Sequence, residues 1–276
     1  MLSGYGADNA PIRVPGITIY FWIVKILTTG AGESASDYLG ANVNHAIGAA
    51  IGGLGLVLAL VLQFRMRRYL AWTYWFAVLM VAVFGTMAAD VLHAVGIPYA
   101  GSTIAFTVIL VVIFALWYRS EHTLSIHSIT TARREGFYWA TVIATFALGT
   151  AAGDVTATTF GWGYFTSGIV FGIAIVIVAI AFIVVDRALP AVHRHRSTVA
   201  VLTFWLAYVL TRPLGASFAD WAGKAPAQSG LGYGDGTVTV VVLVVIVLFV
   251  ALLAVTRVDV QGPEIDAAVT PEALAS

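Results

Sequence analysis

Long apolar stretches dominate the chain, and shorter polar stretches separate them. A helix needs about 20 largely apolar residues to cross the ~30 Å hydrocarbon core of a bilayer. Eight segments approach that length, and they cover residues 17–39, 46–64, 70–92, 103–118, 137–155, 168–185, 199–217 and 237–256. The pattern predicts an all-α membrane protein with eight transmembrane helices, a single transmembrane domain over residues 1–276 that has the lipid bilayer as its partner.

The eight segments are of two kinds, and the two kinds alternate. The even-numbered segments, such as the one that contains VVLVVIVLFV at 241–250, are almost purely aliphatic. The odd-numbered segments also carry aromatic residues, threonines and charges. Since polar and ionisable groups inside a membrane are costly to keep, we expect function to reside on the odd-numbered helices.

The odd-numbered segments are copies of one pattern, which identifies an internal repeat. An overlay without gaps aligns FWIVKILTTGAGESASDYL, YWFAVLMVAVFGTMAADVL, YWATVIATFALGTAAGDVT and FWLAYVLTRPLGASFADWA. All four share a Trp, a Gly and an Asp at fixed spacing: Trp22, Trp75, Trp139 and Trp205; Gly32, Gly85, Gly149 and Gly215; Asp37, Asp90, Asp154 and Asp220. We expect the glycines to permit close helix crossing and the tryptophans to anchor packing.

Each copy contains two spans, so all copies enter the membrane from the same side. Such parallel repeats are related by an axis along the membrane normal. The sequence therefore predicts four helix-hairpin repeats in a pseudo-symmetric bundle, either a pseudo-fourfold ring or a pair of pairs. The predicted repeats cover approximately 14–68, 69–118, 134–187 and 198–257, and a polar cytoplasmic tail covers 258–276.

Composition supports a membrane protein and limits its partners. Hydrophobic residues make up 60% of the chain, charged residues make up 10%, and the mean hydropathy of +0.92 is far above that of soluble domains. Fourteen basic residues balance fourteen acidic ones, so no nucleic-acid partner is expected. The absence of cysteine excludes disulfides and thiolate metal sites.

The basic residues are distributed unevenly between the loops. Most of them precede the first span, follow an even-numbered span or follow the last one: Arg13, Arg65, Arg67, Arg68, Arg119, Arg133, Arg134, Arg187, Arg194, Arg196 and Arg257. By the positive-inside rule these positions are cytoplasmic. We therefore expect a multi-pass protein of the plasma (inner) membrane with both termini in the cytoplasm.

A polar stripe follows one face of the first segment. At about 100° per residue, Lys25, Glu33 and Asp37 share one arc of the helix, and the same face of the fourth copy carries Arg212 and Asp220. Because charged groups that face lipid are costly, this face should turn toward the bundle interior or a water-filled cavity. The residues predicted to line a substrate or ion pathway are Lys25, Thr29, Glu33, Asp37, Thr86, Asp90, Thr150, Asp154, Arg212 and Asp220.

Each part of this stripe has a structural and a functional interpretation. The four aspartates either accept hydrogen bonds near the helix ends or form an acidic vestibule that gathers cations. Glu33 and Arg212 either form an ion pair that locks the first copy to the fourth or respond to a ligand. Lys25 has no carboxylate one turn away on its own helix, which favours a functional role for it.

Other chemistry has weak support in the sequence. His45 and His93 lie near helix ends, and they are weak candidates for a metal site with Asp37. No nucleophile elbow, phosphate loop, zincin helix or dinucleotide fingerprint is present. We therefore expect no enzymatic activity and no cofactor.

Two stretches carry a resemblance to a known family. They are VPGITIYFWIVKILTTGAGESASDYL at 14–39 and TRPLGASFADWAGK, followed by GLGYGDGTV, at 211–238. They resemble bacterial polytopic inner-membrane proteins built from four copies of a repeat of unknown function, an uncharacterised membrane-anchored family. The resemblance covers residues 14–257; it implies the four-repeat architecture and carries over no catalytic residues.

Two functional hypotheses follow from these patterns. The first is a small-solute or cation transporter, or a channel-like protein, with an inward-facing polar site. The alternative is a non-transporting membrane scaffold or stress sensor, in which the polar stripe is a structural hydrogen-bond network. The alternative predicts a sealed bundle without a continuous polar path from the aspartates to Lys25.

Overall fold

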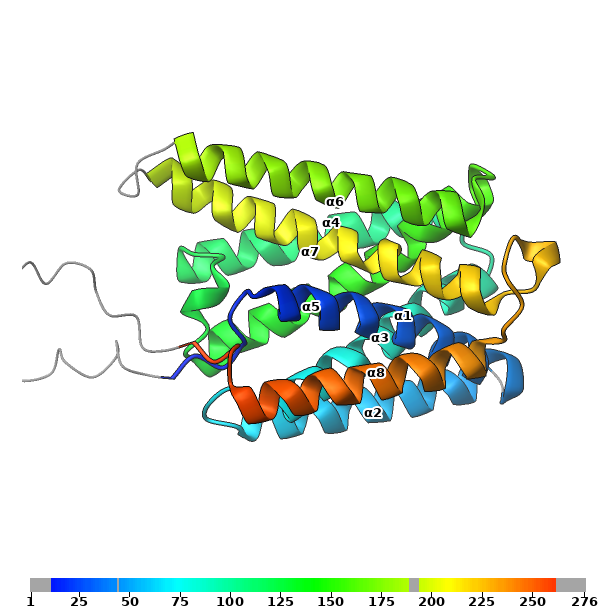
Figure 1. Ribbon diagram of the computed structural model, residues 1–276, viewed down its shortest axis with the longest axis horizontal. Coiled ribbons are helices and arrows are strands. Elements are labelled where there is room, and N and C mark those ends of the chain that lie inside the picture. Colours follow the sequence, from blue (N-terminus) through cyan, green and yellow to red (C-terminus); the bar gives the residue numbers. More distant parts are fainter. Residues whose placement is uncertain (1–10, 44, 189–193, 262–276) are drawn as a thin grey trace, which may run out of the picture.

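The computed structural model describes residues 11–43, 45–188 and 194–261, and this part of the chain is all-helical (Figure 1). The long helices are α1 (Ile19–Asn42), α2 (His45–Arg65), α3 (Ala71–Ala94), α4 (Tyr99–Glu121), α5 (Ala132–Asp154), α6 (Gly163–Ala188), α7 (Arg194–Gly223) and α8 (Asp235–Thr256). The short segments are η1 (Ile126–Ser128), η2 (Val155–Thr159) and η3 (Pro226–Gln228). The predicted eight long helices are present, and no strand occurs in the described residues.

Length and composition make this chain a polytopic membrane protein. Seven of the described helices, α2 to α8, are long and apolar enough to cross a membrane. The remaining one, α1, has 24 residues and contains three charged side chains, Lys25, Glu33 and Asp37. Several helices extend beyond the predicted spans, since a helix continues through Gly, Thr and charged residues that lower the hydropathy at its ends.

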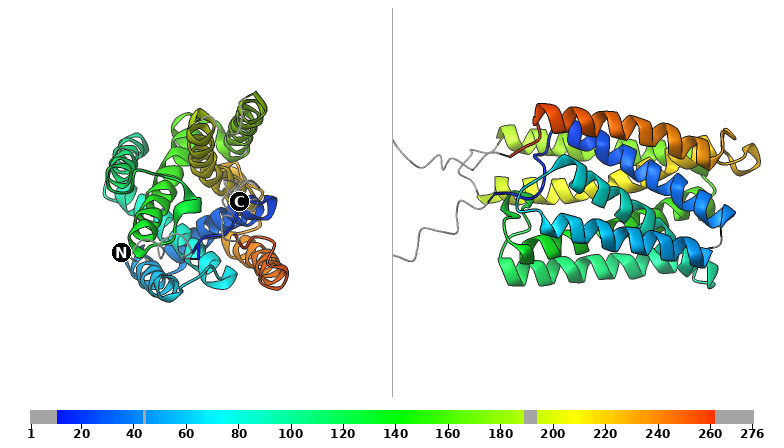
Figure 2. Two further views of the ribbon diagram at one scale, coloured as in Figure 1. Left: turned by 90° about the vertical axis from the view of Figure 1, so that its left-hand side faces the viewer. Right: turned by 90° about the horizontal axis from the view of Figure 1, so that it is seen from below.

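The four odd-numbered helices form a closed inner ring. α1 packs on α3, α3 on α5, α5 on α7, and α7 on α1. The end-on view in Figure 2 shows these helices around a common axis. Of the two arrangements that the repeat allows, the structure has the pseudo-fourfold ring.

Each even-numbered helix covers the odd-numbered helix of the following copy. α2 packs mainly on α3, α4 on α5 and α6 on α7, and α8 returns to pack on α1. Contacts between the two helices of one copy are much less extensive. The two helices of each repeat are therefore connected as a hairpin. The even-numbered helix, however, packs on the following repeat and makes few contacts within its own. The outer helices carry many exposed aliphatic side chains, as expected of a surface in contact with lipid.

The shared glycines set the spacing of the inner ring. The glycine of each copy lies against the residue three positions before the glycine of the next copy: Gly32 against Ala82, Gly85 against Phe146, Gly149 against Arg212, and Gly215 against Thr29. A Cβ atom on Gly85 would lie 2.7 Å from the Phe146 Cβ atom, closer than real Cβ contacts allow. One contact is thus repeated four times around the ring, and it requires a residue without a side chain.

The two ends of the bundle differ in charge. The described chain begins and ends at one of them, which we call the terminal end (Figure 1). The arginines that flank the described spans lie there, at Arg13, Arg65, Arg67, Arg68, Arg119, Arg133, Arg134, Arg187 and Arg257. The opposite end, which we call the distal end, carries Lys224 between α7 and η3.

Aromatic side chains and the segment 11–18 close the terminal end. The aromatic pairs that begin each repeat pack together on the ring axis, and the buried members are Phe21, Tyr74, Trp75, Tyr138, Trp139, Phe204 and Trp205. The segment 11–18 is tied to the rest of this end by backbone hydrogen bonds, from Arg13 N to the Ile129 carbonyl (3.1 Å) and from Gly16 N to the Asp259 carbonyl (2.7 Å). The axis is therefore filled at this end.

Candidate functional site

An ion pair between the first and fourth copies lies inside the ring. Arg212 Nη2 donates to Glu33 Oε2 at 2.6 Å, and the exposed fractions of the two side chains are 0% and 5%. Thr150 accepts from the same nitrogen at 2.8 Å, and Thr86 also accepts from it. The Thr86 hydroxyl lies 3.1 Å from Glu33 Oε2. All four copies therefore contribute one side chain to this network.

The internal repeat explains why these residues meet. Glu33, Thr86 and Thr150 each follow the shared glycine of their copy by one position, so they lie at one level of the ring. Arg212 precedes Gly215 by three positions, and Gly149 leaves the space that its side chain occupies. Arg212 Nη1 also donates to the Thr29 carbonyl at 3.2 Å. Burial of both charges is tolerated because each has hydrogen-bonding partners.

Lys25 lies nearer the terminal end and is fully buried. Its Nζ atom lies 4.0 Å from the ring centroid of Phe146 and 4.3 Å from that of Tyr208. Within the described residues, Nζ donates no hydrogen bond. Aromatic faces attract a cation, but they do not replace its hydration shell completely. Lys25 is therefore a buried cation that aromatic faces compensate only in part.

The four aspartates lie on the distal side of the ion pair. The Asp37 carboxylate forms an ion pair with Lys224 at 2.7 Å, and Asp90 accepts a hydrogen bond from Ser36 at 3.4 Å. Asp154 and Asp220 lie within electrostatic range of Glu33 and Asp37. The four aspartates converge on the inside of the bundle, as the sequence pattern indicates.

Lys224, which follows α7, bridges two helices at the distal end. Its Nζ atom lies 2.7 Å from Asp37 Oδ2 and 3.6 Å from Asp235 Oδ2. Burial disfavours its charged form, but the carboxylates of Asp37 and Asp220 and the hydrogen bond to Asp37 outweigh this effect. Together they raise the pKa of the ammonium above its usual range. Lys224 therefore remains a cation at neutral pH.

A pocket of about 350 Å³ lies at the distal end, and two of the four aspartates, Asp37 and Asp90, line it. We call the four aspartates together with Glu33 the acidic layer. Ser36, Asp37, Asp90 and Lys224 contribute to its wall, together with the exposed His93. The polar groups thus lie where solvent reaches the bundle. The arrangement can attract cations at the distal end and hold them against carboxylate oxygens.

Of the two histidines suggested for a metal site, His93 has a side chain within the described residues. His93 stacks on Tyr99 with ring centroids 3.8 Å apart, and its Nδ1 atom lies 3.4 Å from the Ile97 carbonyl. The side chain of His45 lies outside the described residues. Among the described residues, the group with the geometry of a metal site consists of Glu33, Asp37 and Asp220.

Sequence reasoning missed a second buried network at the terminal end. Arg13 Nη1 donates to Glu135 Oε2 at 2.7 Å, and Gln63 Nε2 donates to Glu135 Oε1 at 3.0 Å. Glu135 and Gln63 are fully buried. The sequence offered two signals of this network. Glu135 is a carboxylate just inside the start of α5, and Gln63 is an amide inside an apolar span.

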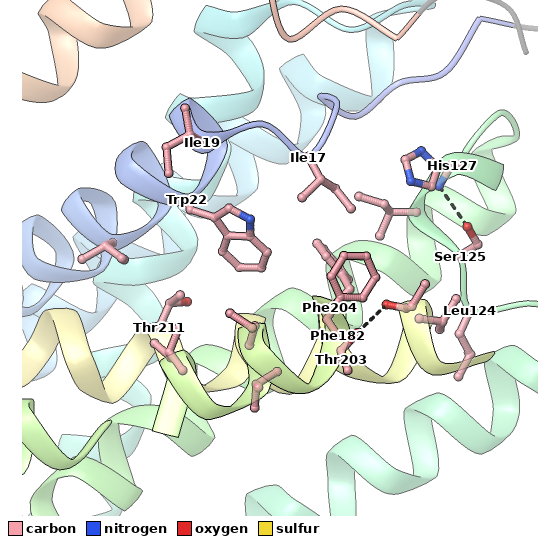
Figure 3. A pocket seen from close by; sticks show the side chains of 18 residues that line it. Ile17, Ile19, Trp22, Leu124, Ser125, His127, Phe182, Thr203, Phe204 and Thr211 are labelled. Atoms are coloured by element: carbon pink, nitrogen blue, oxygen red, sulfur yellow. Dashed lines mark hydrogen bonds between the residues drawn. The ribbon is translucent and has the colours of Figure 1, made fainter. Parts of the chain in front are cut away.

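An apolar crevice of about 510 Å³ lies between α1, α6 and α7 (Figure 3). Trp22, Phe182 and Phe204 point into it, and Thr211 lies at one side. Trp22 therefore differs from its three equivalents, which are buried in the aromatic layer. The crevice holds little polar surface, and none of the ten predicted pathway residues lines it.

These features define a class of protein: an all-α membrane protein whose four repeats form an inner ring around buried charges. The chain matches the sequence model of the family described as Repeat of Unknown Function (DUF347) four times, over residues 20–69, 73–123, 137–188 and 203–259. The matches cover most of the chain, so the protein belongs to this family. No curated protein and no solved structure matches it.

Proposed function

We propose that the protein is a non-enzymatic transporter or channel-like protein for a small cation, and that the distal pocket is where the ion enters. The observation that carries this proposal is the convergence of five carboxylates inside the ring, two of which, Asp37 and Asp90, line that pocket: Glu33, Asp37, Asp90, Asp154 and Asp220. Two cations, Arg212 and Lys224, pair with members of this layer. With all carboxylates ionised, three negative charges remain in excess.

The direction of access follows from the charge distribution. The arginine-rich terminal end is cytoplasmic under the positive-inside rule, so the acidic pocket faces the other side of the plasma (inner) membrane. The buried aromatic side chains that begin each repeat and the segment 11–18 close the terminal end. These features correspond to one state of an alternating-access cycle, open to the outside.

The ion pair lies between the pocket and the closed end. A cation that passes from the aspartates toward Lys25 must pass the Glu33–Arg212 pair. Movement of Arg212 away from Glu33 would open this level, and the carboxylate would then be free for the ion. Lys25, buried beyond it, would repel the ion until the closed end opens. The pair and Lys25 thus provide two gates on one axis.

Flux into proteoliposomes tests the proposal. The purified chain would be compared with the Lys25→Ala and Asp37→Asn variants, and with Glu121→Gln as a matched carboxylate control. Glu121 pairs with Arg133 and Arg134 at the terminal end, away from the pocket. We expect cation flux in the wild type and in Glu121→Gln, and a reduced flux in Asp37→Asn. Lys25→Ala should alter the flux, because the charge that repels the ion is lost. Transport is refuted if neither Lys25→Ala nor Asp37→Asn alters the flux of any ion tested.

One observation favours the scaffold or stress-sensor alternative. The polar groups on the terminal side of the ion pair are almost completely buried: Lys25, Tyr74, Tyr138 and Tyr208. In this conformation they are therefore sealed from the pocket. A scaffold would show no flux, and its variants would change only the stability of the bundle. The same vesicle experiment therefore separates the two functions.

A further inference from the structure

Three carboxylates from the first and last copies meet at the base of the acidic layer. Glu33, Asp37 and Asp220 each place one carboxylate oxygen within 4.8 Å of the others. Oxygens on opposite sides of a single ion, with bonds of about 2.1–2.5 Å, lie about 4.2–5 Å apart. The three carboxylates therefore lie within the coordination sphere of one ion.

One of these carboxylates lacks a partner that its burial requires. The exposed fraction of Asp220 is 5%, and its Oδ1 atom forms no hydrogen bond within the part of the chain that is described. A buried polar atom without a partner is costly, and a charged one more so. Asp220 lies beside Glu33 and Asp37, which both have basic partners. A bound ion would supply what Asp220 lacks.

The charges indicate which kind of ion fits. Glu33, Asp37 and Asp220 carry three negative charges, and Arg212 and Lys224 carry two positive ones. If Lys224 leaves, the three carboxylates and Arg212 together carry a net charge of −2, which a divalent cation neutralises. Carboxylate oxygens are hard ligands and favour Mg²⁺, Mn²⁺ or Ca²⁺. Lys224 is well placed to leave, because it lies at the pocket and also contacts Asp235.

We propose that Glu33, Asp37 and Asp220 bind a hard divalent cation, and that Lys224 is a tethered competitor that gives up Asp37 when the ion binds. This inference rests on the proposed function and names the class of its ion. In the ion-free state, the ammonium of Lys224 neutralises part of the acidic layer. In the bound state, the metal replaces it, and Lys224 retains Asp235 as its partner.

Binding of Mn²⁺ alone to the purified full chain tests this site. Electron paramagnetic resonance of free Mn²⁺ gives the affinity and the stoichiometry in detergent or in nanodiscs. We expect one Mn²⁺ per chain, which Ca²⁺ or Mg²⁺ displaces at sufficient concentration. Asp220→Asn should weaken binding by about tenfold to a hundredfold, since even outer-shell changes have effects of that size. Glu121→Gln should bind as the wild type does.

The Lys224→Gln variant should change the affinity for Mn²⁺ in the direction opposite to Asp220→Asn. Removal of the competitor should tighten Mn²⁺ binding, a gain that a misfolded variant cannot produce. The site is refuted if the wild type binds no Mn²⁺ at millimolar concentration, if Asp220→Asn binds with unchanged affinity, or if Lys224→Gln binds no more tightly.

Failure of the site and failure of transport are distinguishable. If Mn²⁺ binds as described but does not cross vesicle membranes, the site stands and transport is refuted. If a cation crosses at a rate that is unchanged in Asp220→Asn, transport stands and the site is refuted.

Discussion

Arg212 and Glu33 lie 179 positions apart in the chain and form an ion pair of 2.6 Å inside the ring. Each belongs to a different end of the sequence, so the pair joins the last copy of the repeat to the first. Thr86 and Thr150, from the two copies between them, accept hydrogen bonds from the arginine. The two middle copies thus act as neutral partners for a charge pair that the outer two copies provide.

Breaking this pair on one side should destabilise the protein strongly. Arg212→Gln leaves Glu33 buried without its cation, a change that costs about 3–5 kcal/mol for buried pairs. The double variant Glu33→Gln/Arg212→Gln removes both charges and should recover a large part of that loss. Chemical or thermal unfolding in detergent of the wild type, both single variants and the double variant measures the coupling. A double variant no more stable than Arg212→Gln would show that the two charges do not act as a pair.

Substitutions at the shared glycines should depend on which contact each makes. In Gly32→Ala the new Cβ atom would lie 2.8 Å from the carbonyl carbon of Ala82, and in Gly215→Ala it would lie 2.7 Å from the carbonyl oxygen of Ile26. Backbone atoms cannot move aside, so we expect losses of about 1–3 kcal/mol at each site.

Gly136, inside α5, supplies the control for these substitutions. A Cβ atom there meets nothing within 4 Å. Gly136→Ala should be neutral or stabilise the protein by up to about 1 kcal/mol, the difference in helix propensity. Melting temperatures of the three variants, measured together, show whether Gly32→Ala and Gly215→Ala are less stable than Gly136→Ala. Equal effects at all three glycines would contradict close packing of the ring.

Lys25 should oppose stability while it serves function. Its ammonium is fully buried and contacts two aromatic faces in place of a carboxylate. Replacement of a buried charge by an apolar side chain of similar size often stabilises a protein, by about 1–4 kcal/mol. We expect Lys25→Met to raise the melting temperature and to alter ion flux, because the charge that repels a cation at this level is lost. A variant that is less stable than the wild type would indicate that Lys25 is held mainly for packing.

Acidic pH should increase the contribution of the Asp259 side chain to the stability of the folded protein. Burial raises the pKa of Asp259, although the hydrogen bond from Tyr69 opposes the shift. A carboxyl whose pKa is raised in the folded state is favoured there in its neutral form. Its contribution to stability is therefore greatest at low pH and is lost as the pH rises through the folded-state pKa.

Comparison with Asp259→Asn isolates this effect. The asparagine cannot titrate. The unfolding free energy of the wild type minus that of the variant should therefore fall as the pH rises from about 4 toward neutrality. A difference that grows over this range would reverse the sign and contradict a raised pKa.

The position of the polar stripe could be predicted from the sequence because two independent constraints agree on it. Charged residues cannot face lipid, and the fourfold repeat places Asp37, Asp90, Asp154 and Asp220 at one level. Both constraints act on the odd-numbered helices alone, and the structure places those helices inside. The even-numbered helices are uniformly aliphatic, so their sequences hold no information about which neighbour they cover. Their packing on the following copy could not be predicted.

Other parts of the site depend on contacts between distant residues. Lys224 lies in the segment between α7 and η3, and no local pattern in the sequence indicates that it pairs with Asp37. Phe146 and Tyr208 occupy the positions of Arg212 and Lys25 in their own copies, yet both face Lys25. The repeat gives their level in the ring, whereas the direction of each side chain depends on the crossing of the helices.

The packing of each outer helix on the following copy has a consequence for biosynthesis. α1 emerges first from the ribosome and holds the most costly charges, but its cover, α8, and the cation for Glu33, on α7, are made last. During synthesis, α1 must therefore remain in the membrane without its final neighbours until translation is almost complete. We expect a chain truncated after residue 188 to insert poorly and to be degraded, whereas supplying residues 194–261 as a separate fragment should rescue it.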